Sequence, residues 1–238
     1  DHLIKNNEVF ADTFKEAVQI AEEGANLVTV GITPNYPETG YGYIKYNQDD
    51  KKNNAYSVEK FVEKPDLETA KSYLADGTYL WNSGMFVWKV STILDCFKKF
   101  MPDTYEGLLK IKAAVGTADE NAVLEAEFPN LESQSVDYGI MEKADNVYML
   151  CTDFGWADLG TWGSLFDLAP KDENNNAVLK NSNALLYESS GNVIAVGNSK
   201  RLAVIQGVED CIVAESGNVL LICKKDDEQR IKQFVADA

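Results

Sequence analysis

The chain has 238 residues, of which 45% are hydrophobic and 11% aromatic, a composition typical of a globular protein with a substantial core. Its formal net charge is −16, which disfavours binding to nucleic acid and to anionic membrane surfaces. No run of 18 apolar residues occurs, so we expect no transmembrane helix. The sequence opens with Asp1 rather than Met, without a signal-peptide pattern, and we expect the natural amino terminus to lie upstream.

The cysteine and histidine content restricts the chemistry that the chain can carry. Four cysteines, at positions 96, 151, 211 and 223, form no Cys-x-x-Cys pair, which is typical of reduced thiols in a cytoplasmic protein. The single histidine is His2, at the end of the chain, which argues against a Ser-His-Asp triad, a Cys-His dyad and a His-rich zinc site. Any catalysis must therefore use carboxylates, lysines, a metal ion and the backbone.

The first 170 residues predict alternating helices and strands, as in an α/β domain. Thr13-x-x-Glu16 fits a capping box, so a helix is expected to begin at Asp12 or Thr13, and Ser91 and Thr161 are expected to cap two others. The predicted helices cover 13–23, 66–75, 91–100, 105–127 with a break near Gly116, 136–143 and 162–168; the predicted strands cover 26–32, 58–62, 80–89 and 146–151.

Residues 170–176 form a polar linker, after which the pattern changes. Short β-rich runs recur every eight to ten residues, which predicts a sandwich, a barrel or a short β-solenoid. These runs are 184–187, 192–196, 202–205, 211–214 and 219–222, and a last helix is predicted over 226–235.

Five segments carry residues that could perform chemistry, and each also has a purely structural explanation. Gly40 and Gly42 could serve a turn, Glu63 and Lys64 could be a solvated pair, and Asn82-Ser-Gly could be a β-bulge. Asp158 precedes Gly160 in a common turn composition. The fifth segment is Asp1-His2, which places a carboxylate at the start of the chain.

Together, the order and the residue sequences of these segments are more specific for a protein family than any single segment. The set resembles the mannose-1-phosphate guanylyltransferase family of sugar nucleotidylyltransferases, over nearly the whole chain. The segments that carry the resemblance are Asp1-His2, Pro37-Glu-Thr-Gly-Tyr-Gly-Tyr-Ile44, Val58-Glu-Lys-Phe-Val-Glu-Lys-Pro65, Trp81-Asn-Ser-Gly-Met-Phe86, Ser135-x-Asp-Tyr-x-x-Met-Glu-Lys143 and Trp156-x-Asp-x-Gly-Thr-Trp162.

The resemblance implies a fold, a reaction and a set of site residues. The expected fold is a partial Rossmann-like α/β nucleotidyltransferase domain over 1–170, followed by a small β-rich, left-handed β-helix-like domain over 177–238. Asp1 and Asp158 would hold Mg²⁺ and act in catalysis together with Lys64. Four residues would line the pocket for the sugar and its phosphate: Gly42, Glu63, Lys64 and Asn82. The implied reaction transfers a guanylyl group from GTP to mannose 1-phosphate, giving GDP-mannose and pyrophosphate.

One departure from the family pattern is large, because no Gly-x-Gly-x-Arg segment for the nucleotide triphosphate is present. We therefore expect the amino-terminal nucleotide-binding half to be missing and these 238 residues alone to be inactive. Two alternatives remain: transfer to another sugar 1-phosphate, such as glucose 1-phosphate with a uridylyl or thymidylyl donor, and a noncatalytic subunit that binds sugar phosphates. The tail is expected to contribute to a homodimer, and no isomerase domain is expected after the last helix.

Overall fold

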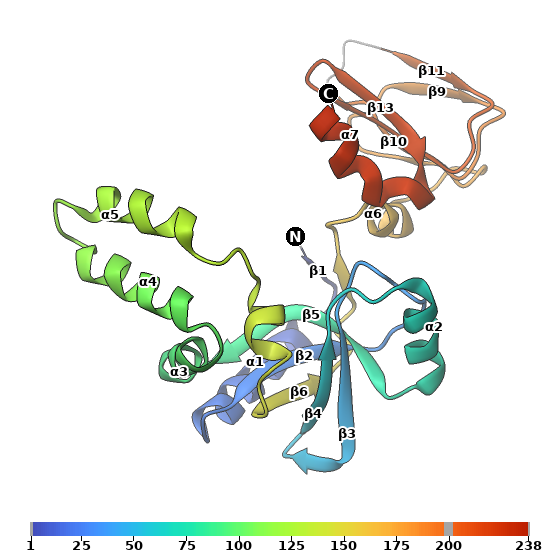
Figure 1. The fold of residues 1–238 in the computed structure, drawn as a ribbon. Coiled ribbons are helices and arrows are strands. Elements are labelled where there is room, and N and C mark those ends of the chain that lie inside the picture. The colour runs from blue at the N-terminus through green and yellow to red at the C-terminus, as the bar shows by residue number, and fades with distance from the viewer. Residues whose placement is uncertain (1, 198–201, 238) are drawn as a thin grey trace. The chain divides into compact units, whose positions relative to one another are not determined.

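The computed structural model describes residues 2–197 and 202–237, which fall into two compact units (Figure 1). One unit comprises Ile4–Gly155, and the other comprises Trp156–Ala238 together with the first three residues. No described helix combines the length and the apolar character needed to cross a membrane.

The unit Ile4–Gly155 is built on a closed five-stranded sheet in the order β2-β5-β3-β4-β6. The strands β2 and β6 are parallel, and the other neighbouring pairs are antiparallel. The strands are β2 (Leu27–Ile32), β3 (Tyr43–Lys52), β4 (Ala55–Val62), β5 (Tyr79–Trp88) and β6 (Val147–Cys151); the helices are α1 (Asn7–Glu22), α2 (Leu67–Asp76), α3 (Val90–Phe100), α4 (Pro102–Ala114) and α5 (Glu120–Glu127), with a 3₁₀ turn η1 (Phe128–Asn130) and a π-helical turn η2 (Asp137–Met141).

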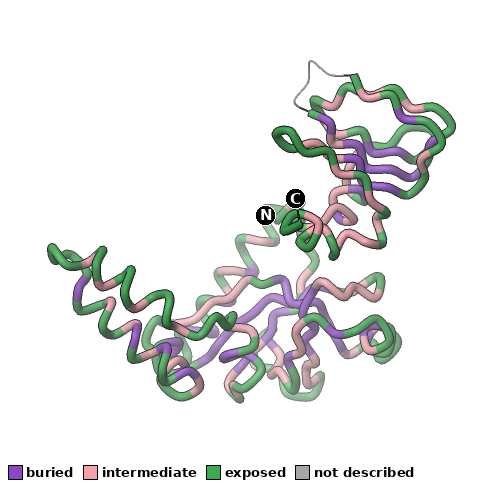
Figure 2. The backbone as a smooth tube through the Cα atoms, turned by 45° about the horizontal axis from the view of Figure 1, so that its top comes forward, coloured by how far each residue is buried: buried purple, intermediate pink, exposed green. Residues whose placement is uncertain are grey.

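The core of this unit lies on both sides of β2, whose six residues are all buried. Successive side chains of a strand point to opposite faces, so Leu27 joins a cluster that includes Ile140 of η2, whereas Val28 packs with Ile20 of α1. Figure 2 shows the buried residues following the strands, while the hairpin of α4 and α5 is largely exposed. The sheet is thus the rigid base from which strand ends and loops present their side chains.

The first helix begins earlier than the sequence predicted. Helix α1 starts at Asn7, and the Asn6 side chain caps it by accepting a hydrogen bond from the backbone N–H of Val9 at 3.1 Å. The expected cap Thr13 lies inside the helix, where its hydroxyl donates to the Val9 carbonyl. Asparagine is a good N-cap residue, so the sequence did indicate a helix start at Asn6. The prediction instead followed the capping-box pattern at Thr13. Helix α3 likewise begins at Val90 and has no side-chain cap, contrary to the expectation for Ser91.

The sequence analysis also missed most of β3, which extends to Lys52. Its polar residues 45–52 lack the apolar alternation of a half-buried strand, yet they pair with β4 in a hairpin. Asn53 occupies the turn with φ of 54°, a backbone conformation that asparagine tolerates. The predicted helix over 105–127 is divided into α4 and α5, with Gly116 in the break at φ of 78°.

The other unit contains a short β-solenoid, one of the three architectures predicted from the spacing of its strands. The strands β8, β10 and β12 are parallel neighbours, β9 and β11 form a second parallel pair, and β13 is antiparallel to β12. The elements are β1 (His2–Ile4), which pairs with β7 (Trp156–Asp158), α6 (Trp162–Leu168), β8 (Ala177–Val178), β9 (Ala184–Tyr187), β10 (Val193–Ala195), β11 (Ala203–Gln206), β12 (Cys211–Ser216), β13 (Val219–Lys224), the 3₁₀ helix η3 (Lys225–Arg230) and α7 (Ile231–Asp237).

Buried asparagines join successive turns of this solenoid. The Asn192 amide donates to Asn176 Oδ1 at 2.9 Å and to the Val208 carbonyl at 2.7 Å, and Asn192 Oδ1 accepts from the backbone N–H of Cys211 at 2.9 Å. Both asparagines are almost fully buried. Because buried polar groups are costly unless they are hydrogen-bonded, this network ties the coils to one another.

Candidate functional site

Three of the predicted pocket residues converge at one edge of the closed sheet. Gly42 directly precedes β3, Glu63 directly follows β4, and Asn82 lies on β5. A Cβ atom at position 42 would overlap Glu63 Oε2 and would lie 3.2 Å from Asn82 Cβ. The backbone N–H of Asn82 also donates to the Gly42 carbonyl at 2.8 Å. A methyl group at position 42 would therefore force the Glu63 carboxylate to shift, so close approach favours glycine here and the turn explanation for Gly42 is insufficient.

The Glu63 carboxylate is nearly buried, with 9% of its side chain exposed. Oε1 accepts a hydrogen bond from Lys64 Nζ at 2.6 Å, whereas Oε2 is buried and has no hydrogen-bond partner among the described residues. Burial raises the pKa of Glu63 because it disfavours the charged form, and Lys64 partly offsets this effect. Buried acceptors are normally hydrogen-bonded, so Glu63 Oε2 would gain a partner from a ligand hydroxyl if the side chain moved to expose it.

Lys64 is the cation of this edge, and 56% of its side chain is exposed. Its hydrogen bond to Glu63 raises the pKa of Lys64, so the ammonium group stays protonated at neutral pH. Its backbone has φ of 45°, in the left-handed region that non-glycine residues rarely occupy. The side chain is thus a charged group beside a buried carboxylate, held on a strained turn.

Asn82 is fixed in orientation by a β-bulge, as one interpretation of its sequence predicted. The pairing of β5 with β2 is irregular between Thr29 and Gly31, and Gly84 has φ of 71°. Asn82 Oδ1 accepts from the Thr29 hydroxyl at 3.2 Å and from the Gly84 N–H at 3.1 Å. The amide therefore presents its NH₂ group, which donates to Asp137 Oδ1 at 3.2 Å.

Two carboxylates at this edge were not assigned from the sequence. Asp137 accepts from Asn82, and Glu142 Oε1 accepts from the backbone N–H of Glu63 at 3.1 Å. Both belong to the segment Ser135-x-Asp-Tyr-x-x-Met-Glu-Lys143, which was used only to establish the resemblance. Their five-residue separation suits a π-helical turn, which is too rare to be predicted from sequence.

The two predicted metal ligands belong to the other unit. Asp158 ends β7, and its Oδ1 accepts from the Gly160 N–H at 2.9 Å, so the expected Asp-x-Gly turn is present. Asp1 lies outside the described residues. No group of three or more His, Cys, Asp or Glu side chains in the described parts of the chain is arranged to hold a metal ion.

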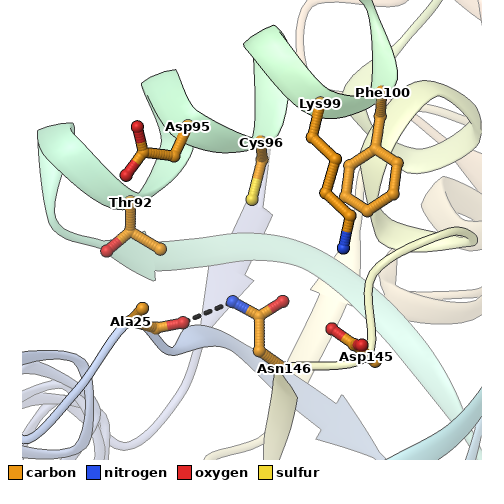
Figure 3. Close-up of a pocket in the computed structure, with 8 residues that line it drawn as sticks. All are labelled: Ala25, Thr92, Asp95, Cys96, Lys99, Phe100, Asp145 and Asn146. Carbon is orange, nitrogen blue, oxygen red and sulfur yellow. Dashed lines mark hydrogen bonds between the residues drawn. The ribbon is translucent and has the colours of Figure 1, made fainter.

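A separate hollow of about 270 Å³ lies between α3 and the ends of β2 and β6 (Figure 3). It is lined by Ala25, Thr92, Asp95, Cys96, Lys99, Phe100, Asp145 and Asn146, none of which the sequence analysis singled out for function. The Asn146 amide donates to the Ala25 carbonyl across it. Burial raises the pKa of the Cys96 thiol, which disfavours the reactive thiolate.

Comparison with known proteins gives two family matches along the chain. Residues 1–175 match the model of a nucleotidyl transferase family. The chain belongs to this family. Residues 183–237 match a second model, described as a mannose-phosphate isomerase/GMP-like β-helix domain. The expected α/β nucleotidyltransferase fold with a β-helix-like tail is thereby confirmed.

Relatives of this nucleotidyl transferase include two named mannose-1-phosphate guanylyltransferase. The Klebsiella pneumoniae protein is 37% identical over 99% of this chain and 50% of its own length, and an Escherichia coli protein has the same identity and coverage. The chain thus spans about half the length of these relatives, so the position of its last residue gives no argument about a further domain. A crystal structure of mannose-1-phosphate geranyltransferase from Thermus thermophilus is 30% identical, with a TM-score of 0.80 over all of this chain and 67% of that one.

Proposed function

We propose that the protein transfers a guanylyl group from GTP to mannose 1-phosphate, forming GDP-mannose and pyrophosphate. In this reaction an oxygen of the sugar phosphate attacks the α-phosphorus of GTP, the new P–O bond forms, and the bond to pyrophosphate breaks. The phosphate is already an anion at neutral pH, since its second pKa lies near ~6, so no histidine base is needed. The reaction depends on positioning and on charge stabilisation, which carboxylates, lysine and backbone can supply.

The arrangement of Gly42, Glu63 and Asn82 is the observation that supports this proposal most strongly. A sugar hydroxyl can donate to the unpartnered Glu63 Oε2, and a neighbouring hydroxyl can accept from the Asn82 NH₂ group. Lys64, protonated and half-exposed beside Glu63, can bind the anomeric phosphate. A polyhydroxylated ring that carries one phosphate satisfies all three groups, whereas an apolar ligand would leave Glu63 unpaired.

The proposed cofactor is Mg²⁺, with Asp158 and Asp1 as its protein ligands. Mg²⁺ uses one or two carboxylates together with substrate phosphates, and Asp158 fits this requirement because the Gly160 N–H orients its carboxylate. When bound, the ion would neutralise charge that develops on the phosphates. The chain's own contribution is to hold Asp158 in a defined turn at the end of β7.

Pyrophosphate release provides the test, with the longest native form of the protein, GTP and Mg²⁺. We expect turnover with mannose 1-phosphate and much slower turnover with glucose 1-phosphate or with UTP or dTTP as donor. A preference for glucose 1-phosphate would overturn the assigned sugar. Binding of mannose 1-phosphate without turnover would overturn the catalytic proposal in favour of a noncatalytic subunit.

We further propose that the protein is a cytoplasmic homodimer that needs neither nucleic acid nor membrane. Its four cysteines are all described and free, which fits a reducing compartment. On the outer face of the β9–β11 sheet, Leu185, Tyr187 and Val204 are 46%, 54% and 64% exposed, and a second copy could cover this apolar face. Light scattering should therefore give a dimer for the wild type and a monomer for Val204→Glu, while the exposed control Asn174→Glu stays dimeric; an unchanged mass in all three excludes this face.

A further inference from the structure

The π-helical turn η2 ends in two acidic side chains that contact different strands. The Glu142 N–H donates to the Asp137 carbonyl at 3.0 Å, across five residues, so the turn places Asp137 and Glu142 at its two ends. Packing fixes the turn, because Ile140 and Met141 are fully buried and a Cβ atom at Gly139 would overlap Met101. A rigid element therefore supplies both carboxylates.

These carboxylates reach the two strands that carry the candidate pocket. Asp137 accepts from the Asn82 amide of β5, as described above. Glu142 Oε1 accepts from the backbone N–H of Glu63, at the first position after β4. A hydrogen bond from an N–H to a charged carboxylate is stronger than one between neutral groups. Glu142 thus fixes the backbone where the strand turns.

The backbone of this turn is strained at Lys64, the residue that follows Glu63. Lys64 has φ of 45°, and the following residue is the buried Pro65. Non-glycine residues in this region cost about 1–3 kcal/mol and keep the conformation only where neighbouring contacts impose it. The contacts present are the Glu63–Glu142 hydrogen bond before Lys64 and the Asp66 cap of α2 after it, which accepts from Thr69 at 2.8 Å.

We propose that Glu142 is a positioning residue that holds Lys64 in its left-handed conformation and so aims the ammonium group at the phosphate of the substrate. This inference rests on the proposed function for the identity of the substrate. The hydrogen bond between the Glu63 N–H and Glu142 does not depend on that proposal. Loss of the Glu142 acceptor frees the Glu63 N–H, and the backbone at Lys64 can relax to negative φ. The Lys64 ammonium group then leaves Glu63 Oε1 and is no longer aimed at the phosphate.

Amide hydrogen exchange of the ligand-free chain tests the contact directly. Glu142 is solvent-exposed, so we expect Glu142→Ala to accelerate exchange at the Glu63 N–H by about twofold to tenfold, because a hydrogen bond worth about 0.5–1.5 kcal/mol is lost. Glu142→Gln keeps the acceptor oxygen and should keep most of the protection. Glu132→Ala, an exposed carboxylate upstream of the same turn, serves as the control and should change nothing. Unchanged exchange at Glu63 in Glu142→Ala would overturn the proposal.

Binding of mannose 1-phosphate, measured by calorimetry, tests the functional consequence. Glu142→Ala should weaken binding by roughly tenfold in the wild-type background and by less than about twofold in the Lys64→Ala background, since its effect passes through Lys64. Equal effects in both backgrounds would overturn the positioning role and indicate general destabilisation. If the wild type binds no mannose 1-phosphate, the proposed function fails, while the exchange experiment still decides whether Glu142 holds the turn.

Discussion

Glu63 and Lys64 are adjacent residues whose side chains are bonded to each other at the end of a strand, with Glu63 Oε1 2.6 Å from Lys64 Nζ. Adjacent strand residues normally point to opposite faces, so this contact requires the turn at Lys64. The two side chains differ in solvent exposure, because the carboxylate is nearly buried and the ammonium group is half-exposed. Burial raises the pKa of Glu63, and the Glu63 carboxylate raises the pKa of Lys64.

The raised pKa of Glu63 predicts a pH-dependent stability difference for Glu63→Gln. An acid with a raised folded-state pKa contributes most below its unfolded pKa, which lies near 4.5, and this contribution is lost as pH rises through the folded pKa. Glutamine does not titrate. The Tm of Glu63→Gln minus that of the wild type should therefore increase from pH 4 to pH 8. A difference that stays constant or falls over this range contradicts the assignment of burial as the main cause.

The close approach at Gly42 predicts that Gly42→Ala weakens binding of the sugar phosphate. The added methyl group would overlap Glu63 Oε2 and displace the carboxylate from the proposed pocket, and a loss of about 1.4 kcal/mol in binding free energy would weaken binding roughly tenfold. Gly163→Ala is a suitable control, because its methyl group would approach nothing closer than Glu228 Oε2 at 3.7 Å. Calorimetric titration of both variants with mannose 1-phosphate checks the prediction. Wild-type affinity in Gly42→Ala would remove Gly42 from the pocket.

The sequence predicted those features that depend on local chemistry. Thr161 caps α6 as expected, with its hydroxyl accepting from the Ser164 N–H at 3.1 Å, and the buried run 27–32 forms β2. The periodic short strands of the tail were sufficient to include a solenoid among the alternatives. Capping, periodicity and apolar runs are properties of neighbouring residues, so a single sequence contains them.

Features that depend on partners distant in sequence were not predicted. The polar strand β3 forms because β4 and β5 pair with it, not because of its own pattern. The roles of Asp137 and Glu142 depend on strands that lie 55 and 79 residues away in the sequence. The need for glycine at position 42 likewise appears only when Glu63 is placed opposite it. The ordered motifs predicted which residues gather at this edge of the sheet. The contacts among these residues could be identified only from the folded structure.

The asparagine network predicts that Asn192→Ala destabilises the solenoid. The substitution leaves the buried Cys211 N–H without its acceptor, and it removes one of two donors to the part-buried Val208 carbonyl, which still accepts from the Ser190 N–H at 3.2 Å. The expected loss in the free energy of unfolding is about 2–4 kcal/mol, measured by urea denaturation. Asn174→Ala removes an exposed side chain and should change stability by less than about 0.5 kcal/mol. Similar small losses in both variants would show that the network contributes little.

The two Asp-x-Gly turns near β7 provide a matched test of the proposed metal ligand. Asp158 Oδ1 accepts from the Gly160 N–H at 2.9 Å, and Asp153 Oδ1 accepts from the Gly155 N–H at 3.1 Å, so the two aspartates make the same local hydrogen bond. Only Asp158 is proposed to hold Mg²⁺. Asparagine keeps the hydrogen bond of each turn but removes the charge, so any difference between the variants reports on the charge at that position.

We expect Asp158→Asn to lower kcat for pyrophosphate release by roughly a hundredfold or more in the longest native form, because a metal ion supplies several kcal/mol of charge stabilisation. Asp153→Asn should retain nearly wild-type kcat. The KM for mannose 1-phosphate should change little in either variant, since the proposed sugar contacts lie on the closed sheet. Residues 1–238 alone should release no pyrophosphate, because they contain no Gly-x-Gly-x-Arg segment to bind the triphosphate. Equal losses of kcat in the two variants would assign the effect to the turns rather than to a metal ion. Turnover by residues 1–238 alone would place the nucleotide site within these residues.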